Sequence, residues 1–237
     1  ISRHYGAQQK ENVHIAVQTT IAMTILMSVV LSICGVLLTP ALLRMMKTPE
    51  DVIAHSSEYL RIYFAGLSGL LLYNMGAGIL RAVGDTRRPL YFLIFSAVTN
   101  TVLDLLFVTV FHMGVSGVAI ATILAQFASA VLVMVVLTRS TSDYRIVWRG
   151  MRLNRKMFGS ICRLGFPAAV QLAVTSFSNI FVQSYINRFG ADCMAGWTSH
   201  NKIDSFVLLP IMTISLAVTT FVGQNLGAGD QARARQG

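Results

Sequence analysis

The fold is decided by residues 90–137, which read LYFLIFSAVTNTVLDLLFVTVF (90–111), HMGVSG (112–117) and VAIATILAQFASAVLVMVVL (118–137). Two apolar runs therefore flank a short turn. Each run holds about 20 residues, and a helix of that length extends roughly 30 Å, which matches the hydrocarbon core of a bilayer. The stretch predicts a hairpin of two antiparallel helices that cross a membrane.

The rest of the chain has the same character. Hydrophobic residues make up 54% of the 237 residues and charged residues only 12%, whereas about 25% of residues are charged in soluble domains. Further apolar runs of membrane length are expected at 15–38, 59–80, 165–187 and 197–222. The sequence predicts an all-α, polytopic transmembrane helical bundle. Because the chain opens without Met, we expect a fragment of a longer protein.

Three residues of the hairpin are candidates for a cation site. Asn100 and Asp104 are four residues apart and share one helical face, and Thr122 lies at a similar depth on the other run. A lone Asn or Thr in a membrane more often bonds a neighbouring helix, but a carboxylate at this depth is expected to be functional. Carboxylate, amide and hydroxyl oxygens suit Na⁺ or, at the carboxylate, a proton. Asn100, Asp104 and Thr122 are therefore the predicted cation ligands.

Polar residues also recur along the run at 165–187. Gln171, Thr175, Asn179 and Gln183 are spaced by four, and Asn187 continues the series. Such a stripe faces either a cavity or a polar helix interface. We predict a substrate cavity lined by this stripe and by two charged residues near the start of the last run, Lys202 and Asp204.

Other patterns concern packing and helix ends. The small residues Gly117, Ala121, Ala125 and Ser129 recur every fourth position and predict a close helix contact. Thr48 followed by Pro49 predicts a helix start that continues into the run at 59–80. Pro210 predicts a kink in the last run.

Residues 139–163 are rich in Arg and carry the interleaved apolar residues Ile146, Trp148, Met151, Leu153, Met157 and Phe158. This pattern predicts a basic amphipathic linker on an anionic membrane face, and nucleic acid is not expected as a partner. Basic residues also concentrate at the chain start, at 81–89 and in the tail, so the positive-inside rule places these segments and the linker in the cytoplasm. We expect residues 1–138 to hold four helices of an amino-terminal lobe and residues 164–237 to begin a carboxy-terminal lobe with two.

An internal repeat supports two lobes. Residues 2–7, SRHYGA, resemble residues 223–228, GQNLGA. Six spans lie between the copies, so both copies are expected at the same membrane face. The repeat predicts two parallel six-helix halves in the parent protein.

Four motifs together resemble the multidrug and toxic compound extrusion (MATE) family: LRAVGDTRRP (80–89), VSGVAIAT (115–122), GFP (165–167) and FVGQNLGAG (221–229). The resemblance covers helices three to eight of the family's twelve. It implies two lobes around a central cavity and an exchange of Na⁺ or H⁺ for cationic, amphipathic drugs. It also implies a cation site whose Asn, Asp and Thr match Asn100, Asp104 and Thr122; the family's helix-one Asp is not in this sequence. Some members use a helix-seven carboxylate instead, and the run at 165–187 has none.

The function predicted is a secondary-active multidrug efflux antiporter of the cell (inner) membrane, working by alternating access as a monomer among membrane lipids, without a cofactor. A lipid-linked oligosaccharide flippase of the same superfamily is the alternative; the absence of mid-span Arg disfavours the basic cavity that it needs. A membrane enzyme is not expected, since the chain has no HExxH motif, phosphate loop or Ser/His/Asp set. A receptor or structural protein leaves the repeat unexplained.

Overall fold

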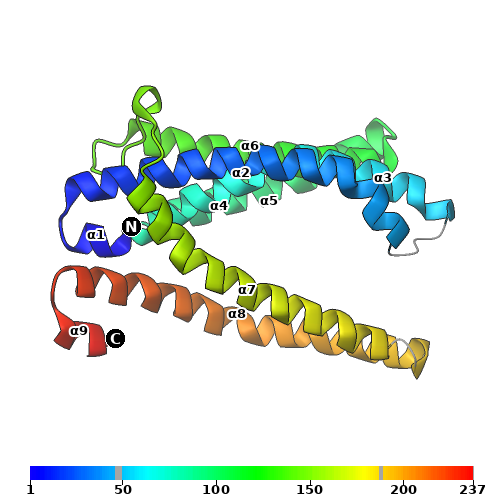
Figure 1. Cartoon of the computed structure of the whole chain (residues 1–237). Coiled ribbons are helices and arrows are strands. Elements are labelled where there is room, and N and C mark those ends of the chain that lie inside the picture. The colour runs from blue at the N-terminus through cyan, green and yellow to red at the C-terminus, as the bar shows by residue number, and fades with distance from the viewer. Residues whose placement is uncertain (46–49, 187–188, 237) are drawn as a thin grey trace.

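The computed structural model of the chain describes residues 1–45, 50–186 and 189–236 (Figure 1). Its elements follow the chain in the order α1 (Ser2–Gly6), α2 (Lys10–Met45), α3 (Glu50–Ala65), α4 (Leu67–Ala82), α5 (Arg87–Leu105), the π-helix η1 (Leu106–Val110), α6 (Gly114–Arg139), the 3₁₀ turn η2 (Trp148–Gly150), α7 (Arg155–Ile186), α8 (Ala191–Gly227) and α9 (Gln231–Gln236). The described residues contain no strand, which confirms the predicted all-α class.

Five helices are long and apolar enough to cross a membrane, and the count is six if the bent pair α3–α4 is taken as one span. The run predicted as one span at 59–80 is therefore broken, with a bend of 44° between α3 and α4. Gly66 lies at the break, and a Cβ on it would collide with the side chain of Ile123 on α6. The bend thus brings the backbone of this span directly against α6, a contact that only glycine permits.

Two predicted helix features, the kink at Pro210 and the helix start at Thr48, stay predictions. Pro210 lies inside α8, which continues without interruption from Ala191 to Gly227. The helix start predicted at Thr48 and Pro49 lies outside the described residues.

The core of the bundle lies where α2, α4 and α6 meet. The predicted small-residue stripe of α6 is confirmed as a packing surface, because Gly117, Ala121, Ala125 and Ser129 are all buried. Glycines of α4 complete the contact: a Cβ on Gly69 would lie 3.1 Å from the Phe127 ring. Small residues on both helices let the two backbones approach closely, which drives helix association in a membrane.

The predicted amphipathic linker at 139–163 lies only partly outside the helices. Residues 140–154 form a loop that contains only η2, and residues 155–163 already belong to α7. Ile146 was expected to face the membrane; instead its side chain is 1% exposed and packs in the core with Val17, Leu80 and Leu137. This placement is set by tertiary packing, which the alternation of basic and apolar residues does not reveal.

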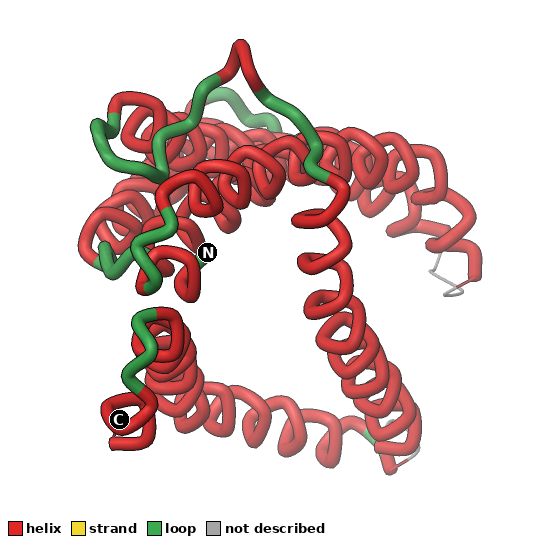
Figure 2. The backbone as a smooth tube through the Cα atoms, turned by 60° about the vertical axis from the view of Figure 1, so that its left-hand side comes forward, coloured by secondary structure: helices red, strands yellow, loops and turns green. Residues whose placement is uncertain are grey.

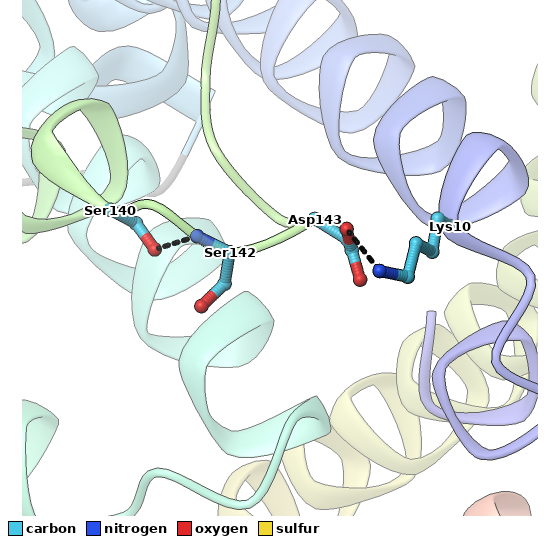
Figure 3. A network of polar contacts seen from close by, with 4 residues as sticks. All are labelled: Lys10, Ser140, Ser142 and Asp143. Atoms are coloured by element: carbon cyan, nitrogen blue, oxygen red, sulfur yellow. Dashed lines mark hydrogen bonds and ion pairs between the residues drawn. The ribbon is translucent and has the colours of Figure 1, made fainter.

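Polar contacts also hold the loop to the bundle. Figure 3 shows Asp143 of the loop paired with Lys10 at the start of α2, at 3.9 Å, and the Ser142 N–H donating to Ser140 Oγ. Farther along, the Asn154 N–H donates to Thr19 Oγ1 of α2 at 3.4 Å. Asn154 Oδ1 accepts bonds from the N–H groups of Lys156 and Met157 at 3.0 and 3.1 Å, so Asn154 caps α7.

Helices α7 and α8 form an arm that is largely separate from the bundle. Figure 2 shows α7 leaving the bundle at the loop and α8 returning toward the N-terminus. At that end α8 packs along α1, so the two copies of the sequence repeat lie side by side. Gln224 of α8 also donates a 2.8 Å hydrogen bond to the carbonyl oxygen of Ala82 at the end of α4.

Candidate functional site

The predicted cation ligands lie where α5 packs against α6. Asn100 Nδ2 donates a hydrogen bond to Thr122 Oγ1 at 3.4 Å, so the structure brings these two residues together across the helix pair. Thr122 Oγ1 in turn donates to the carbonyl oxygen of Val118 at 2.9 Å. At 3.4 Å the bond between Asn100 and Thr122 is longer than the usual range of about 2.7–3.2 Å. The contact between the two side chains is therefore weak.

Asp104 is one helical turn beyond Asn100 and is partly buried. Its Oδ1 atom is shielded from solvent and has no hydrogen-bond partner among the described residues. A buried carboxylate oxygen without a donor is costly unless a proton or a cation compensates its charge. Asp104 is therefore the residue of this site that most needs a cationic partner.

The backbone next to Asp104 is also unusual. The α-helix α5 ends at Leu105 and continues as the π-helix η1. The N–H of Phe111 bonds the carbonyl of Leu106, five residues earlier, at 3.1 Å. Short π segments inside α-helices occur frequently at functional sites. This one fixes the direction of the chain immediately after the carboxylate.

Asn100 and Thr122 also line a cavity of about 270 Å³ between α4, α5 and α6. Polar residues that sequence reasoning missed share this cavity, among them Tyr73, Asn74, Ser96 and Gln126. The sequence did carry a signal for two of them, because Ser96 precedes Asn100 by four residues and Gln126 follows Thr122 by four. Tyr73 and Asn74 come from α4, and no spacing in the sequence relates them to the hairpin.

Two of these neighbours are fixed by backbone contacts. Ser96 Oγ donates to the carbonyl oxygen of Ala125 at 2.9 Å, and the Tyr73 hydroxyl donates to the carbonyl oxygen of Pro89 at 3.0 Å. The polar surface that extends from Asn100 toward α4 is therefore a built part of the bundle. In the described residues no group of three or more His, Cys, Asp or Glu could hold a metal ion. The structure thus brings Asn100 and Thr122 together in the cavity, and Asp104 lies one helical turn along α5 outside the cavity lining.

The predicted substrate residues lie apart from this site. Gln171, Thr175 and Asn179 are exposed on α7, and Thr175 Oγ1 donates to the Gln171 carbonyl oxygen at 3.0 Å. Gln183 is half-buried on the same helix, and Asn187 lies outside the described residues. Lys202 and Asp204 are exposed on α8. The apolar neighbours on α7 are exposed too, so the burial pattern does not single out the polar stripe.

Comparisons with known proteins bear on this geometry. A family model described as MatE matches residues 1–106 and 167–236. The chain is 33% identical over 243 residues to the "Probable multidrug resistance protein YoeA" of Bacillus subtilis, with 100% of this chain and 52% of that protein covered. It is 36% identical over 204 residues to the "Probable multidrug resistance protein YpnP" of the same organism, with 84% and 44% covered.

A solved structure also resembles this chain. It is described as the "Outward-facing conformation of a multidrug resistance MATE family transporter of the MOP superfamily", with a TM-score of 0.90 and 26% identity. The match covers 99% of this chain and 52% of that one. The chain thus spans about half the length of the curated relatives it matches.

Proposed function

Because the chain belongs to the MatE family of multidrug and toxic compound extrusion transporters, we propose that it forms part of a secondary-active multidrug efflux transporter. The transporter exchanges Na⁺ or H⁺ for cationic, amphipathic small molecules. The observation that carries this proposal is the buried Asp104 Oδ1 atom, which has no hydrogen-bond donor among the described residues; Asp104 follows Asn100 of the Asn100–Thr122 pair by one helical turn. The two relatives named as probable multidrug resistance proteins support drugs as the substrates.

In this proposal the coupling ion binds at Asp104. Asn100 contributes its amide oxygen and Thr122 its hydroxyl oxygen, which replaces the long bond between these two side chains. A proton or Na⁺ removes the cost of the buried charge and changes the contacts between α5 and α6. A ligand can drive a conformational change only through such a difference in affinity between two states.

The proposed orientation places α1, the 140–154 loop and the end of α8 at the cytoplasmic face of a bacterial inner membrane, because Lys and Arg concentrate there. The contact between α1 and α8 then closes the cytoplasmic end. The likeness to a structure described as outward-facing supports this assignment. The substrate contacts the α7 stripe, Gln171 to Gln183, and Lys202 and Asp204 of α8, from the outer side.

The deciding experiment is Asp104→Asn in the full-length transporter. The variant keeps the shape of the side chain and removes its charge, so gradient-driven efflux should be lost while abundance in the membrane stays near normal. Asn100→Ala and Thr122→Ala each remove one neutral ligand and should weaken the ion dependence less. Asp143→Asn, the same change on the cytoplasmic loop, is the matched control.

Efflux is measured with separate Na⁺ and proton gradients in vesicles, which also identifies the coupling ion. Wild-type efflux with unaltered ion dependence in Asp104→Asn would return Asp104 to a structural role and remove the basis of the proposal.

A further inference from the structure

A second site lies at the proposed cytoplasmic end of the bundle, away from Asp104. An apolar groove of about 480 Å³ runs along α6, and its lining comprises Leu72, Phe127, Ala130, Val131, Met134, Val135, Thr138, Arg139 and Trp148. The α6 members recur at three- and four-residue spacing, so they form one face of the helix. From Phe127 to Arg139 the groove extends roughly 18 Å at about 1.5 Å per residue. It therefore follows the helix axis from the middle of the span to its basic end.

A polar cavity of about 500 Å³ adjoins the groove at that basic end, and Val135 and Arg139 line both. Its other members include Arg88, Thr141 and Tyr144. The apolar groove and this polar chamber thus share a wall at Val135 and Arg139, and the chamber is lined by two arginines, hydroxyl-bearing residues and the loop. The combined shape is that of an amphipathic molecule with an anionic end.

The two arginines of the chamber differ in whether a carboxylate lies close enough to neutralise the guanidinium charge. Arg88 Nε lies 3.4 Å from Asp85 Oδ2, so its charge is partly neutralised. The other ion pair among the described residues joins Lys10 and Asp143. Arg139 is exposed and has no carboxylate partner in the described part of the chain. Its guanidinium is free to make bidentate bonds to a phosphate.

Trp148 lines the groove near its basic end, together with Thr138 and Arg139. Its indole Nε1 donates to Thr138 Oγ1 at 3.1 Å, which fixes the ring, while 49% of the residue remains exposed. An indole with one bonded end and an exposed apolar face is typical of the membrane–water interface. With Trp148 at that interface, the groove toward Phe127 lies at the depth of acyl chains, and the Arg139 end lies at the depth of headgroups.

We propose that this groove and chamber bind one anionic phospholipid of the cytoplasmic leaflet. One acyl chain lies along α6 between Phe127 and Val135, and the phosphate contacts the Arg139 guanidinium under the edge of Trp148. The exposed Arg145 and Arg149 of the same loop add positive potential around the headgroup. The site is independent of the ion site at Asp104, and it uses the orientation proposed above.

Native mass spectrometry of the detergent-solubilised protein tests the headgroup contact. Phosphatidylglycerol should bind more tightly than phosphatidylcholine with the same acyl chains. Arg139→Gln should lower the affinity for phosphatidylglycerol about fivefold, the effect of one basic residue near an anionic surface, and leave phosphatidylcholine unchanged. Arg235→Gln removes the same charge at the same face, far from the groove, and should change neither affinity.

The groove is tested by filling it. Val135→Trp should weaken binding of both lipids, because the indole occupies the space of the acyl chain, whereas Val98→Trp on exposed α5 should not. Val131→Phe is a smaller filling variant in case Val135→Trp does not fold. Equal effects of Arg139→Gln and Arg235→Gln would mean attraction by overall charge alone. Equal effects of the filling variants and Val98→Trp would mean that the lipid does not use the groove. Either outcome overturns the lipid proposal. Neither outcome bears on the proposal of ion-coupled efflux.

Discussion

Gly223 lies directly against Ser2, and the two residues hold the same position in the two copies of the sequence repeat. A Cβ on Gly223 would be 3.2 Å from the Cβ of Ser2. The neighbouring contacts are reciprocal: Gly6 faces the backbone carbonyl of Gln224, and Gly227 faces the backbone carbonyl of Arg3. Gly6 and Gly227 hold the same position in the two copies, as do Arg3 and Gln224, so exchanging the copies turns one contact into the other. A local two-fold axis therefore passes beside Ser2 and Gly223.

The closeness of Ser2 and Gly223 allows a covalent test of the proposal that the contact between α1 and α8 closes the cytoplasmic end. In a chain without its native cysteines, Ser2→Cys with Gly223→Cys should form a disulfide, because the Cβ separation of 3.2 Å is only slightly shorter than the usual range of about 3.5–4.5 Å. The bond should stop efflux, and a reductant should restore it. Each single-cysteine variant should transport normally under oxidising conditions. Full efflux with the bond formed would show that α1 and α8 need not separate.

Gly227 should not tolerate a larger side chain. In Gly227→Ala the methyl group meets the Arg3 carbonyl, and overpacking of this kind costs about 1–3 kcal/mol. The equilibrium should shift roughly 5- to 150-fold toward a state with the cytoplasmic end open. Labelling of a cysteine at Ser2 from the cytoplasmic side measures the shift. Gly78→Ala is the control, since nothing lies within 4 Å of a Cβ there, and it should label as the parent does.

The loop residue Ile146 should matter for stability although it lies outside every helix. Ile146→Ala removes a side chain that is 1% exposed, and such truncations cost about 2–5 kcal/mol. Val147→Ala, one residue later and 40% exposed, should change stability by less than about 0.5 kcal/mol. Thermal denaturation in detergent compares the two. Similar melting temperatures would contradict the packing described for the loop.

The orientation can be tested by labelling. Single cysteines at Arg149 and at Val115, both exposed, are treated in intact cells with a membrane-impermeant maleimide. Val115→Cys should react and Arg149→Cys should react only after lysis, because the basic loops stay in the cytoplasm. The opposite pattern would invert the proposed topology.

The α7 stripe is expected to contact substrate. Gln171→Ala should change the relative efflux of different drugs about threefold, the effect of losing a polar contact of about 0.6 kcal/mol, with abundance unchanged. Leu172→Ala, on the adjacent position and 69% exposed, should leave the drug profile as it was. A uniform fall for all drugs together with abundance would favour a packing role.

Patterns within one helix or one hairpin were predictable from the sequence. The buried stripe from Gly117 to Ser129 follows from four-residue spacing, and the pairing of Asn100 with Thr122 follows from counting depth on either side of the turn. Both depend only on the regular rise of a helix.

Features that depend on a distant partner were not predictable. The break at Gly66 lies against Ile123, far along the chain, which occupies the space of a Cβ. Ile146 is buried because α2, α4 and α6 leave room for it, while its local sequence resembles a surface linker. Tyr73 and Asn74 reach the polar cavity only through the packing of α4.

The double attachment of Asn154 has a mechanical consequence. Its backbone N–H is bonded to Thr19 of α2, and its side chain is bonded to the first turn of α7. Because Asn154 ties the first turn of α7 to α2, we expect α7 to tilt about this residue. Helix α7 is long, since its 32 residues extend roughly 48 Å at about 1.5 Å per residue. A tilt of about 10° at the pivot moves the far end by roughly 8 Å on the same geometry, so small adjustments at one hydrogen-bonded residue are amplified at the opposite membrane face.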